Sequence, residues 1–326
     1  MATRVLSGMQ PSGALHLGNL LGALDNFVQL QEHHECFYFI ADWHALTTNF
    51  EDTSKIRFYA REMLIDWLAA GLDPEKSTLF IQSHVPQHAI LYLLLSMITP
   101  VPWLERNPTY KEKQDNIEGR DLSTYGFLGY PVLQAADILL YKGDFVPVGI
   151  DQLPHLELTR EITRRFNGLY KSIFPEPQAL LTEIPKVPGT DGRKMSKSYN
   201  NTINLSDTET EVRAKLKTMV TDPARVRRTD KGNPDVCPVF TLHKAVSSQA
   251  VIDRVNRECR TAEIGCIDCK KLSADAIVAR LTPIWEHRRK LEQQPGLVNE
   301  MIAAGTQRAG VVARDTIAEV TDAMKL

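Results

Sequence analysis

Residues 4–19 read RVLSGMQPSGALHLGN, and this stretch decides the fold. Its apolar start at Arg4–Leu6 predicts a short strand, and a helical pattern runs from about Leu17 to Glu32. The loop between them, Ser7–Gly13, contains glycine, proline and serine. Because the unpaired N–H groups of a helix start converge on the loop before it, this arrangement suits an anion such as a phosphate. An ordinary turn followed by a capped helix would give the same pattern, so the stretch taken alone leaves both interpretations open.

The same alternation of strands and helices continues to about residue 185. Continuous apolar runs predict buried strands at Cys36–Ala41, Thr78–Ile81 and Phe145–Gly149. Helical patterns are found at Thr53–Ala70 (with Asp52 or Thr53 as N-cap), Gln87–Met97, Leu133–Tyr141 and Gln152–Phe166. This order predicts an α/β fold with a doubly wound, parallel, Rossmann-like sheet and helices on both of its faces. Such sheets bind ligands in the loops at the carboxyl ends of their strands.

The chain changes character after Pro185. A linker with proline and glycine spans Pro185–Arg193, and no clear strand follows it. Helical patterns are found at Asp207–Met219 (capped by Ser206), Ser248–Arg257, Ser273–Arg289 and Gly310–Lys325. We therefore expect a nucleotide-binding domain at residues 1–185 and a smaller all-helical domain at residues 186–309. The last helix, at about 310–326, is expected to pack back on the first domain.

The composition is that of a globular protein. Of 326 residues, 43% are hydrophobic and 24% are charged, which excludes a disordered chain. The longest apolar stretch, around Ala89–Ile98, is shorter than the roughly 18 residues that cross a membrane, and the N-terminus lacks the pattern of a signal peptide. We therefore expect a cytoplasmic protein. The balance of 38 basic and 40 acidic residues excludes a generally basic nucleic-acid coat, although a local basic patch is compatible with it.

A second stretch with unusual chemistry reads RKMSKSY at residues 193–199. Lys194 and Lys197 flank a turn rich in hydroxyl groups, and two ammonium groups on a flexible loop can clamp a polyphosphate. A solvated surface loop is the ordinary explanation of such a pentamer. Its coexistence with the glycine-containing loop before Leu17 favours the phosphate clamp instead.

Four cysteines lie close together in the last third of the chain: Cys237, Cys259, Cys266 and Cys269. In a chain without an export signal, a metal site explains them better than disulfides do. Structural zinc usually has two close cysteine pairs, and here only the last two cysteines form one. A 4Fe–4S cluster tolerates irregular spacing, so we expect this cluster ahead of zinc, with unligated buried cysteines as the third explanation.

The quoted motifs resemble those of a known family. HLGN at residues 16–19 with KMSKS at residues 194–198 resembles the paired signature of class I aminoacyl-tRNA synthetases. GMQPSG at residues 8–13, YPVLQAAD at residues 130–137 and VPVGIDQ at residues 146–152 are similar to bacterial tryptophanyl-tRNA synthetases. The cysteines resemble the subset of that family that carries a 4Fe–4S cluster in the helical domain. Residues 186–309 would then hold a mobile KMSKS loop and an anticodon-recognition domain.

The resemblance implies an ATP site. In the family, tryptophan's carboxylate attacks the α-phosphate of ATP with Mg²⁺ present and pyrophosphate leaves, so catalysis depends on positioning and charge neutralisation. Lys194 and Lys197 would clamp the pyrophosphate, and Lys113 matches a further phosphate contact, with a solvated charge run as its alternative. The other implied nucleotide contacts are Gln10, Pro11, Ser12, His16, Gly18, Asn19, Gly149, Ile150, Asp151, Val187, Met195, Ser196 and Ser198.

The resemblance also implies an amino-acid site. Asp137 lies in an otherwise apolar helix, where a carboxylate is costly to bury without a donor, and the indole N–H of tryptophan is such a donor. An internal salt bridge or an N-cap is the alternative. Tyr130 and Gln152 would hold the substrate's ammonium and carboxylate groups. Gln134 stands where many relatives carry methionine, which makes the pocket floor more polar. His44 is expected to be structural rather than catalytic.

The implied macromolecular partner is tRNA(Trp), and the family implies a homodimer. A cluster of basic residues near the cysteines is expected to contact tRNA phosphates: Arg213, Lys215, Lys217, Arg225, Arg227, Arg228 and Lys231. Two other functions remain open. One is the same reaction with tyrosine, and the other is a non-catalytic RNA-binding or iron–sulfur paralogue.

Overall fold

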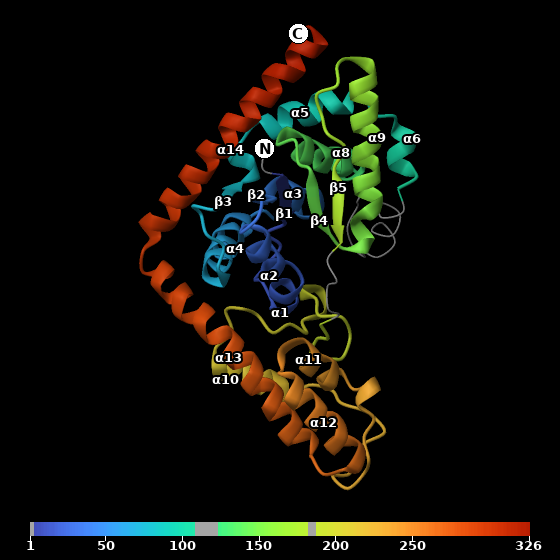
Figure 1. Ribbon diagram of the computed structural model, residues 1–326, viewed down its shortest axis with the longest axis vertical. Helices are drawn as coiled ribbons and strands as arrows, with labels where there is room; N and C mark the ends of the chain where they lie inside the picture. The colour runs from blue at the N-terminus through green and yellow to red at the C-terminus, as the bar shows by residue number, and fades with distance from the viewer. Residues whose placement is uncertain (1–2, 108–122, 182–186) are drawn as a thin grey trace.

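A parallel sheet of five strands forms the centre of the larger part of the molecule (Figure 1). The computed structural model describes residues 3–107, 123–181 and 187–326. The strands lie in the order β3-β2-β1-β4-β5, and each pairs in parallel with its neighbour. They are β1 (Arg4–Met9), β2 (Glu35–Ile40), β3 (Ser77–Ile81), β4 (Phe145–Val148) and β5 (Gln178–Leu181). The predicted doubly wound sheet is confirmed, and β5 is a strand that the sequence did not indicate.

The strand order creates a place for a ligand. From β1 the chain moves outward to β2 and β3, and it then returns to the other side of β1 to form β4 and β5. The connections that leave the carboxyl ends of β1 and β4 therefore diverge, which opens a crevice between these two strands.

Helices cover both faces of the sheet in this part of the chain. The central strands are largely buried because most of their side chains are apolar; in β2, every residue from Cys36 to Ile40 is buried. The covering elements are α1 (Leu17–Asn19), the π-helical turn η1 (Leu20–Leu24), α2 (Asp25–Leu30), α3 (Asp42–Asn49), α4 (Ile56–Ala70), η2 (Gln82–His84), α5 (Gln87–Ser96), α6 (Val101–Glu105), α8 (Tyr125–Leu140), η3 (Ile150–Gln152) and α9 (Leu153–Leu169).

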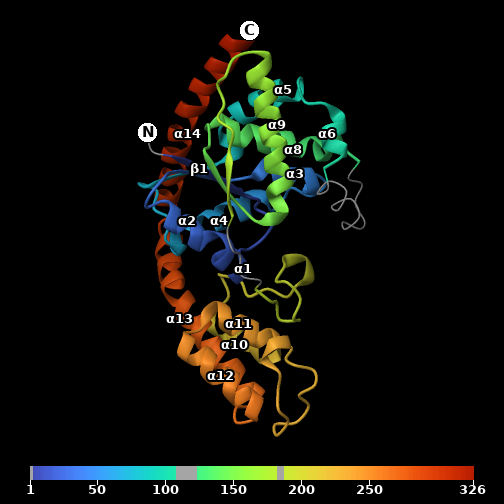
Figure 2. The same ribbon diagram turned by 45° about the vertical axis from the view of Figure 1, so that its right-hand side comes forward.

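The rest of the described chain is helical. Its elements are η4 (Lys197–Tyr199), α10 (Glu209–Thr218), η5 (Pro234–Val236), α11 (Pro238–Val246), α12 (Gln249–Thr261), α13 (Cys266–Glu292) and α14 (Pro295–Met324). Two long helices, α13 and α14, run along one side of the molecule (Figure 1 and Figure 2). α13 packs against α10 and α11 at one end and against α4 at the other, so it joins the helical part to the sheet. α14 packs against β3, α5 and α8.

Several helix limits differ from the prediction for local reasons. α4 begins at Ile56 because the Asp52 side chain accepts hydrogen bonds from Ser54, which forms a turn before the helix. α10 begins at Glu209, and its N-cap is Thr208 rather than Ser206, since Thr208 and Glu211 form a reciprocal capping box. α11 was not predicted, and α13 and α14 are longer than predicted. No helix of the described residues is long and apolar enough to cross a membrane.

Candidate active site

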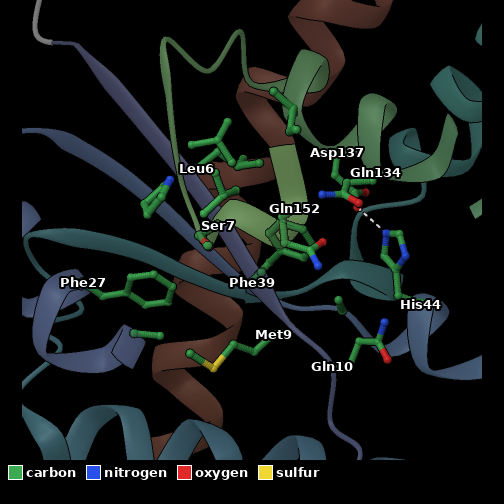
Figure 3. Close-up of a pocket in the computed structure, with 18 of the residues that line it drawn as sticks. Leu6, Ser7, Met9, Gln10, Phe27, Phe39, His44, Gln134, Asp137 and Gln152 are labelled. Carbon is green, nitrogen blue, oxygen red and sulfur yellow. Dashed lines mark hydrogen bonds and ion pairs between the residues drawn. The ribbon is translucent and has the colours of Figure 1, made fainter. Parts of the chain in front are cut away.

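A cavity of about 290 Å³ lies in the crevice between the carboxyl ends of β1 and β4 (Figure 3). We call it the strand-end cavity. The backbone and side chains of Leu6–Gln10 form one wall, and Val146–Gly149 form another. Phe27 and Phe39 give it an apolar surface, and the polar residues that line it include His44, Gln134, Asp137 and Gln152. The cavity is therefore suited to a flat apolar group with a few polar atoms at its edge.

Asp137 is buried in the wall of this cavity, with 1% of its surface exposed. Its Oδ1 accepts hydrogen bonds from Gln82 Nε2 at 2.7 Å and His88 Nδ1 at 2.6 Å, and its Oδ2 accepts from His44 Nε2 at 2.8 Å. Burial would raise the pKa of Asp137, but the hydrogen bonds from both histidines outweigh burial and lower it. The carboxylate therefore stays charged, and His44, expected to be structural, supports it at the cavity wall.

Tyr130 lies apart from the strand-end cavity. Its hydroxyl is 2.9 Å from His155 Nε2, and its ring lines a separate cavity of about 360 Å³ together with Trp43 and Leu133. His155 Nδ1 is in turn 3.0 Å from Asn107 Nδ2. The structure therefore brings Gln134, Asp137 and Gln152 to one cavity, and it places the predicted ammonium-binding tyrosine against a neighbouring one.

A larger cavity of about 470 Å³ adjoins the first, and we call it the loop cavity. The two cavities share Met9, Gln10, Gly22 and Ala23 along their border. The loop cavity brings together most of the predicted nucleotide contacts from two distant parts of the sequence. Its lining includes Gln10, Ser12, His16, Gly18 and Asn19 from the first motif and Val187, Lys194, Met195, Ser196, Lys197 and Ser198 from the second.

His16 and Asn19 are arranged around the helix start. Asn19 Oδ1 accepts a hydrogen bond from the backbone N–H of His16 at 3.1 Å. His16 Nδ1 is buried and has no hydrogen-bond partner among the residues that the structure describes. Burial, together with a smaller effect of the nearby charge of Lys197, lowers the pKa of His16 to about 4. The imidazole is therefore neutral near pH 7, and one of its nitrogens is available to a ligand in the loop cavity.

Lys197 crosses from the second motif to the first. Its Nζ donates a hydrogen bond to the carbonyl of Gly13 at 2.9 Å. Burial lowers the pKa of Lys197 to about 8, and the carboxylate of Asp66 in α4 opposes this shift. Lys194 is exposed, whereas Met195 is buried and its N–H donates to Val187 O at 3.0 Å. One lysine thus holds the two loops together and the other is free to reach into the cavity.

Some predicted contacts are not brought to either cavity. Ile150 is 78% exposed, and Pro11 is buried but lines neither cavity. Gly149 lines the strand-end cavity. Asp151 is the middle residue of η3, and its side chain is not among those that the structure describes. Lys113 also lies outside them.

The four cysteines converge where η5, α11, α12 and α13 meet. The pKa of Cys269 is raised to about 12, mainly by burial. Negative charge on the other three thiols also raises it, which shows that they lie near Cys269. Arg225 Nη1 is 3.7 Å from Cys259 Sγ. Within the described residues, no group of three or more His, Cys, Asp or Glu side chains is arranged so that it could hold a metal ion.

The basic residues near the cysteines do not form one outward face. Arg225 is buried and donates to the carbonyls of Ile264 and Arg228, and Arg228 itself donates to the carbonyls of Ala262 and Glu263. Arg225 therefore points inward, and its guanidinium group holds the backbone of the cysteine region. Of the other predicted residues, Arg213 and Lys215 pair with acids, while Lys217, Arg227 and Lys231 form no ion pair with any described side chain.

Comparison with known proteins identifies the family. A family model described as tRNA synthetases class I (W and Y) matches residues 1–282. The tryptophan–tRNA ligase of Thermotoga maritima is 56% identical over 325 residues, which cover 99% of both chains. The chain belongs to the class I tryptophan–tRNA ligases.

Other members of the ligase family agree over the whole length. The tryptophan–tRNA ligase of Aquifex aeolicus is 45% identical, and the match covers 99% of this chain and 100% of the relative. The crystal structure of tryptophanyl-tRNA synthetase from Campylobacter jejuni complexed with ADP and tryptophan has a TM-score of 0.90 and 33% identity, covering 99% of this chain and 100% of that one. The chain is thus an enzyme, an aminoacyl-tRNA synthetase.

Sequence reasoning missed the residues that support Asp137. Gln82, His88 and Tyr141 come from η2, α5 and the end of α8, and none belongs to a motif. One signal was present for His88, since it is a polar residue in the otherwise apolar pattern of α5. A buried polar residue needs a partner, and that partner is Asp137.

Proposed function

We propose that the chain forms tryptophanyl-adenylate from L-tryptophan and ATP across its two adjoining cavities. The observation that carries the proposal is Asp137, a buried and charged acceptor in the wall of an apolar cavity that borders the loop cavity. An indole ring matches the apolar walls, and its N–H matches the acceptor. The substrate's carboxylate would then point toward Gln10, at the border with the loop cavity.

The reaction needs the attacking carboxylate oxygen and the departing pyrophosphate to be held in line on opposite sides of the α-phosphorus. An oxygen of the tryptophan carboxylate attacks the α-phosphorus, a new P–O bond forms, and the bond to the β-phosphate breaks so that pyrophosphate leaves. The 3′-terminal ribose of tRNA(Trp) then attacks the adenylate's carbonyl and AMP leaves. In both steps the enzyme supplies position and countercharge.

The loop cavity supplies the countercharge. We assign the phosphates to the helix start at Gly18 and Asn19, to His16, and to the ammonium groups of Lys194 and Lys197. Mg²⁺ would enter with ATP and neutralise phosphate charge. The adenosine is assigned to Gln10, Pro11, Ser12, Val187 and the Gly149–Asp151 turn, with Met195, Ser196 and Ser198 forming the loop and Lys113 as a further phosphate contact.

The remaining amino-acid contacts follow from the strand-end cavity. Gln152 lines it and is assigned to the substrate's polar groups, and Gln134 forms part of its wall. Tyr130, which lines the neighbouring cavity, is assigned to the ammonium group.

ATP–pyrophosphate exchange that depends on the amino acid tests this proposal. We expect exchange with tryptophan, and none with tyrosine or phenylalanine at the same concentrations. Exchange with tyrosine would keep the chemistry and contradict the assignment of Asp137. A folded sample without exchange for all three amino acids would favour the non-catalytic paralogue.

We propose that Cys237, Cys259, Cys266 and Cys269 hold a 4Fe–4S cluster with a structural role. The support is the donor set, since four thiols from separate elements converge at one place and thiolates are the ligands of such clusters. The cluster would cross-link three helices beside the proposed RNA surface. Anaerobic purification followed by iron, sulfide and zinc analysis tests this, and about one zinc per chain without iron would support the zinc alternative.

We propose that tRNA(Trp) contacts the helical part of the chain, residues 186–309, and that the protein acts in the cytoplasm. A groove of about 250 Å³ between α10 and α13 supports the tRNA contact, since basic side chains line it beside apolar ones. The basic residues are Arg213, Lys217, Lys270 and Lys271. Replacing Lys270 and Lys271 by glutamate should weaken tRNA charging and leave pyrophosphate exchange intact. Lys325→Glu, far from the groove, is the matched control for charge.

We also propose a homodimer that forms through the sheet-containing part. The support is an apolar stripe along α5, where Ile90, Leu93 and the C-cap residue Met97 are exposed at helical spacing, and Val101 of α6 extends it. Sedimentation of wild type and of Leu93→Asp tests this. A wild-type monomer at micromolar concentration would contradict the proposal.

A further inference from the structure

We propose that His88 and Gln82 are positioning residues that set how Asp137 meets tryptophan. This inference rests on the proposed function, because it takes the indole N–H as the ligand of Asp137. Gln82 and His88 are fully buried and do not line the strand-end cavity, so they can act on a bound ligand only through the carboxylate.

The number of donors around Asp137 leaves a single place for a ligand. A carboxylate offers about four lone-pair positions, two on each oxygen. Gln82 Nε2 and His88 Nδ1 fill both positions of Oδ1, and His44 Nε2 fills one position of Oδ2. Among the described residues no further donor contacts the carboxylate, so one position of Oδ2 remains. His44 and Asp137 both line the cavity, which places this position at the cavity wall.

The surroundings fix the direction of each donor. Trp43 N donates to Gln82 Oε1 at 3.2 Å, which turns the amide so that Nε2 faces Asp137. The Tyr141 hydroxyl is 2.8 Å from His88 Nε2 and holds the imidazole ring in place from the side opposite Asp137. Because a charged carboxylate can only accept, His88 Nδ1 is the donor of the hydrogen bond to Asp137.

The same contacts keep Asp137 charged. The groups that face it are His44 from α3, Gln82 from η2 and His88 from α5, and Tyr141 lies behind His88. The hydrogen bond from His88 is one of the contacts that lower the pKa of Asp137 against burial, so the pKa of Asp137 would rise without it. A protonated carboxyl binds the indole N–H less well, so tryptophan binding would weaken as the pH falls.

Calorimetric binding of two amino acids to the full-length protein tests the inference. L-Tryptophan is compared with its isostere β-(3-benzothienyl)-L-alanine, in which sulfur replaces the N–H, between pH 5.5 and 8. Wild type should prefer tryptophan by roughly 10- to 100-fold at every pH, as expected for a hydrogen bond to a charged group. His88→Leu should lower the preference several-fold and make tryptophan binding weaken toward pH 5.5. His88→Asn, whose amide can donate from the place of Nδ1, should restore most of the preference.

Two further variants separate positioning from folding. Gln82→Met removes the second donor of Oδ1 and should also lower the preference, and it takes over the test if His88→Leu does not fold. Phe166→Leu is the matched control, because it shrinks a buried ring of α9 that has no hydrogen bond to the network. It should lower stability and keep the preference.

Three outcomes would overturn the inference or its basis. The inference would be overturned if both His88→Leu and Gln82→Met preferred tryptophan as strongly as the wild type does and bound it equally well at every pH. It would also be overturned if His88→Asn lost as much of the preference for tryptophan as His88→Leu. A wild type that does not distinguish tryptophan from its isostere would remove the Asp137 assignment on which the inference rests. A wild type that shows this preference but no pyrophosphate exchange would contradict the proposed function and leave the positioning roles supported.

Discussion

Replacing Arg288 by methionine should destabilise the junction between the helical part and the sheet. Arg288 lies in α13 with 7% of its surface exposed, and it pairs with Asp66 and Glu62 of α4 and with Glu292 at 2.9 Å. Asp66 is only 2% exposed, so the variant leaves a buried carboxylate without its countercharge. Removing one partner of a buried ion pair costs about 3–5 kcal/mol. Glu62 is more exposed and can turn to water, so Asp66 carries most of this cost.

The cost should depend on pH in a defined direction. Burial already raises the pKa of Asp66 to about 6 against the lowering effect of Arg288, and without Arg288 this pKa rises further. A carboxyl whose folded pKa lies above the unfolded value of about 3.9 favours folding at low pH, and this contribution is lost as the pH rises through the folded pKa. Arg288→Met should therefore be less destabilising at pH 5 than at pH 8.

Urea denaturation followed by circular dichroism measures both effects. The double variant Arg288→Met/Asp66→Leu should recover most of the stability at pH 8, because it removes the unpaired charge together with its partner. A loss below about 1 kcal/mol in the single variant, or a double variant no more stable than the single one, would refute the reasoning.

Three further predictions concern α14 and the loop cavity. Gly305→Ala should cost about 3 kcal/mol and expose α14 to proteolysis, because the new Cβ would lie 1.8 Å from Leu79 O; an unchanged digestion pattern would contradict this. Binding of ATP near pH 8 should take up part of a proton, since phosphate raises the pKa of Lys197 from about 8, and Lys197→Met should abolish that uptake in calorimetry. His16→Asn should lower kcat for pyrophosphate exchange about 100-fold. The wild-type rate should show no titration of His16 between pH 5.5 and 8, because the pKa of His16 is about 4. A pH dependence of the wild-type rate in this range that His16→Asn removes would contradict the prediction.

The fold could be predicted because its signals are local. The apolar runs at β1, β2, β3 and β4 and the helical patterns between them need no knowledge of distant partners. β5 was missed because it is only four residues long and lies at the edge of the sheet, where both of its ends are exposed. The lengths of α13 and α14 were underestimated because their apolar positions face different neighbours along each helix, which weakens any single periodic stripe.

The site could be predicted only where its signals are local in the sequence. Asp137 was visible because a charge in an apolar helix needs a partner, and the loop-cavity residues were visible because their motifs resemble those of a family. The partners of Asp137 were not visible, since they come from elements 49 to 93 residues away in the chain. The inward turn of Arg225 was equally hidden, because sequence does not show which carbonyls a guanidinium will reach.

A crystal structure of the protein with L-tryptophan and a non-hydrolysable ATP analogue would test the central claim most directly. The account predicts the indole nitrogen within hydrogen-bond distance of Asp137 Oδ2 in the strand-end cavity. It also predicts the triphosphate in the loop cavity, between His16 and the two lysines of residues 194–197. An indole ring seated instead in the neighbouring cavity against Trp43 and Leu133, or a triphosphate that touches neither lysine, would contradict it.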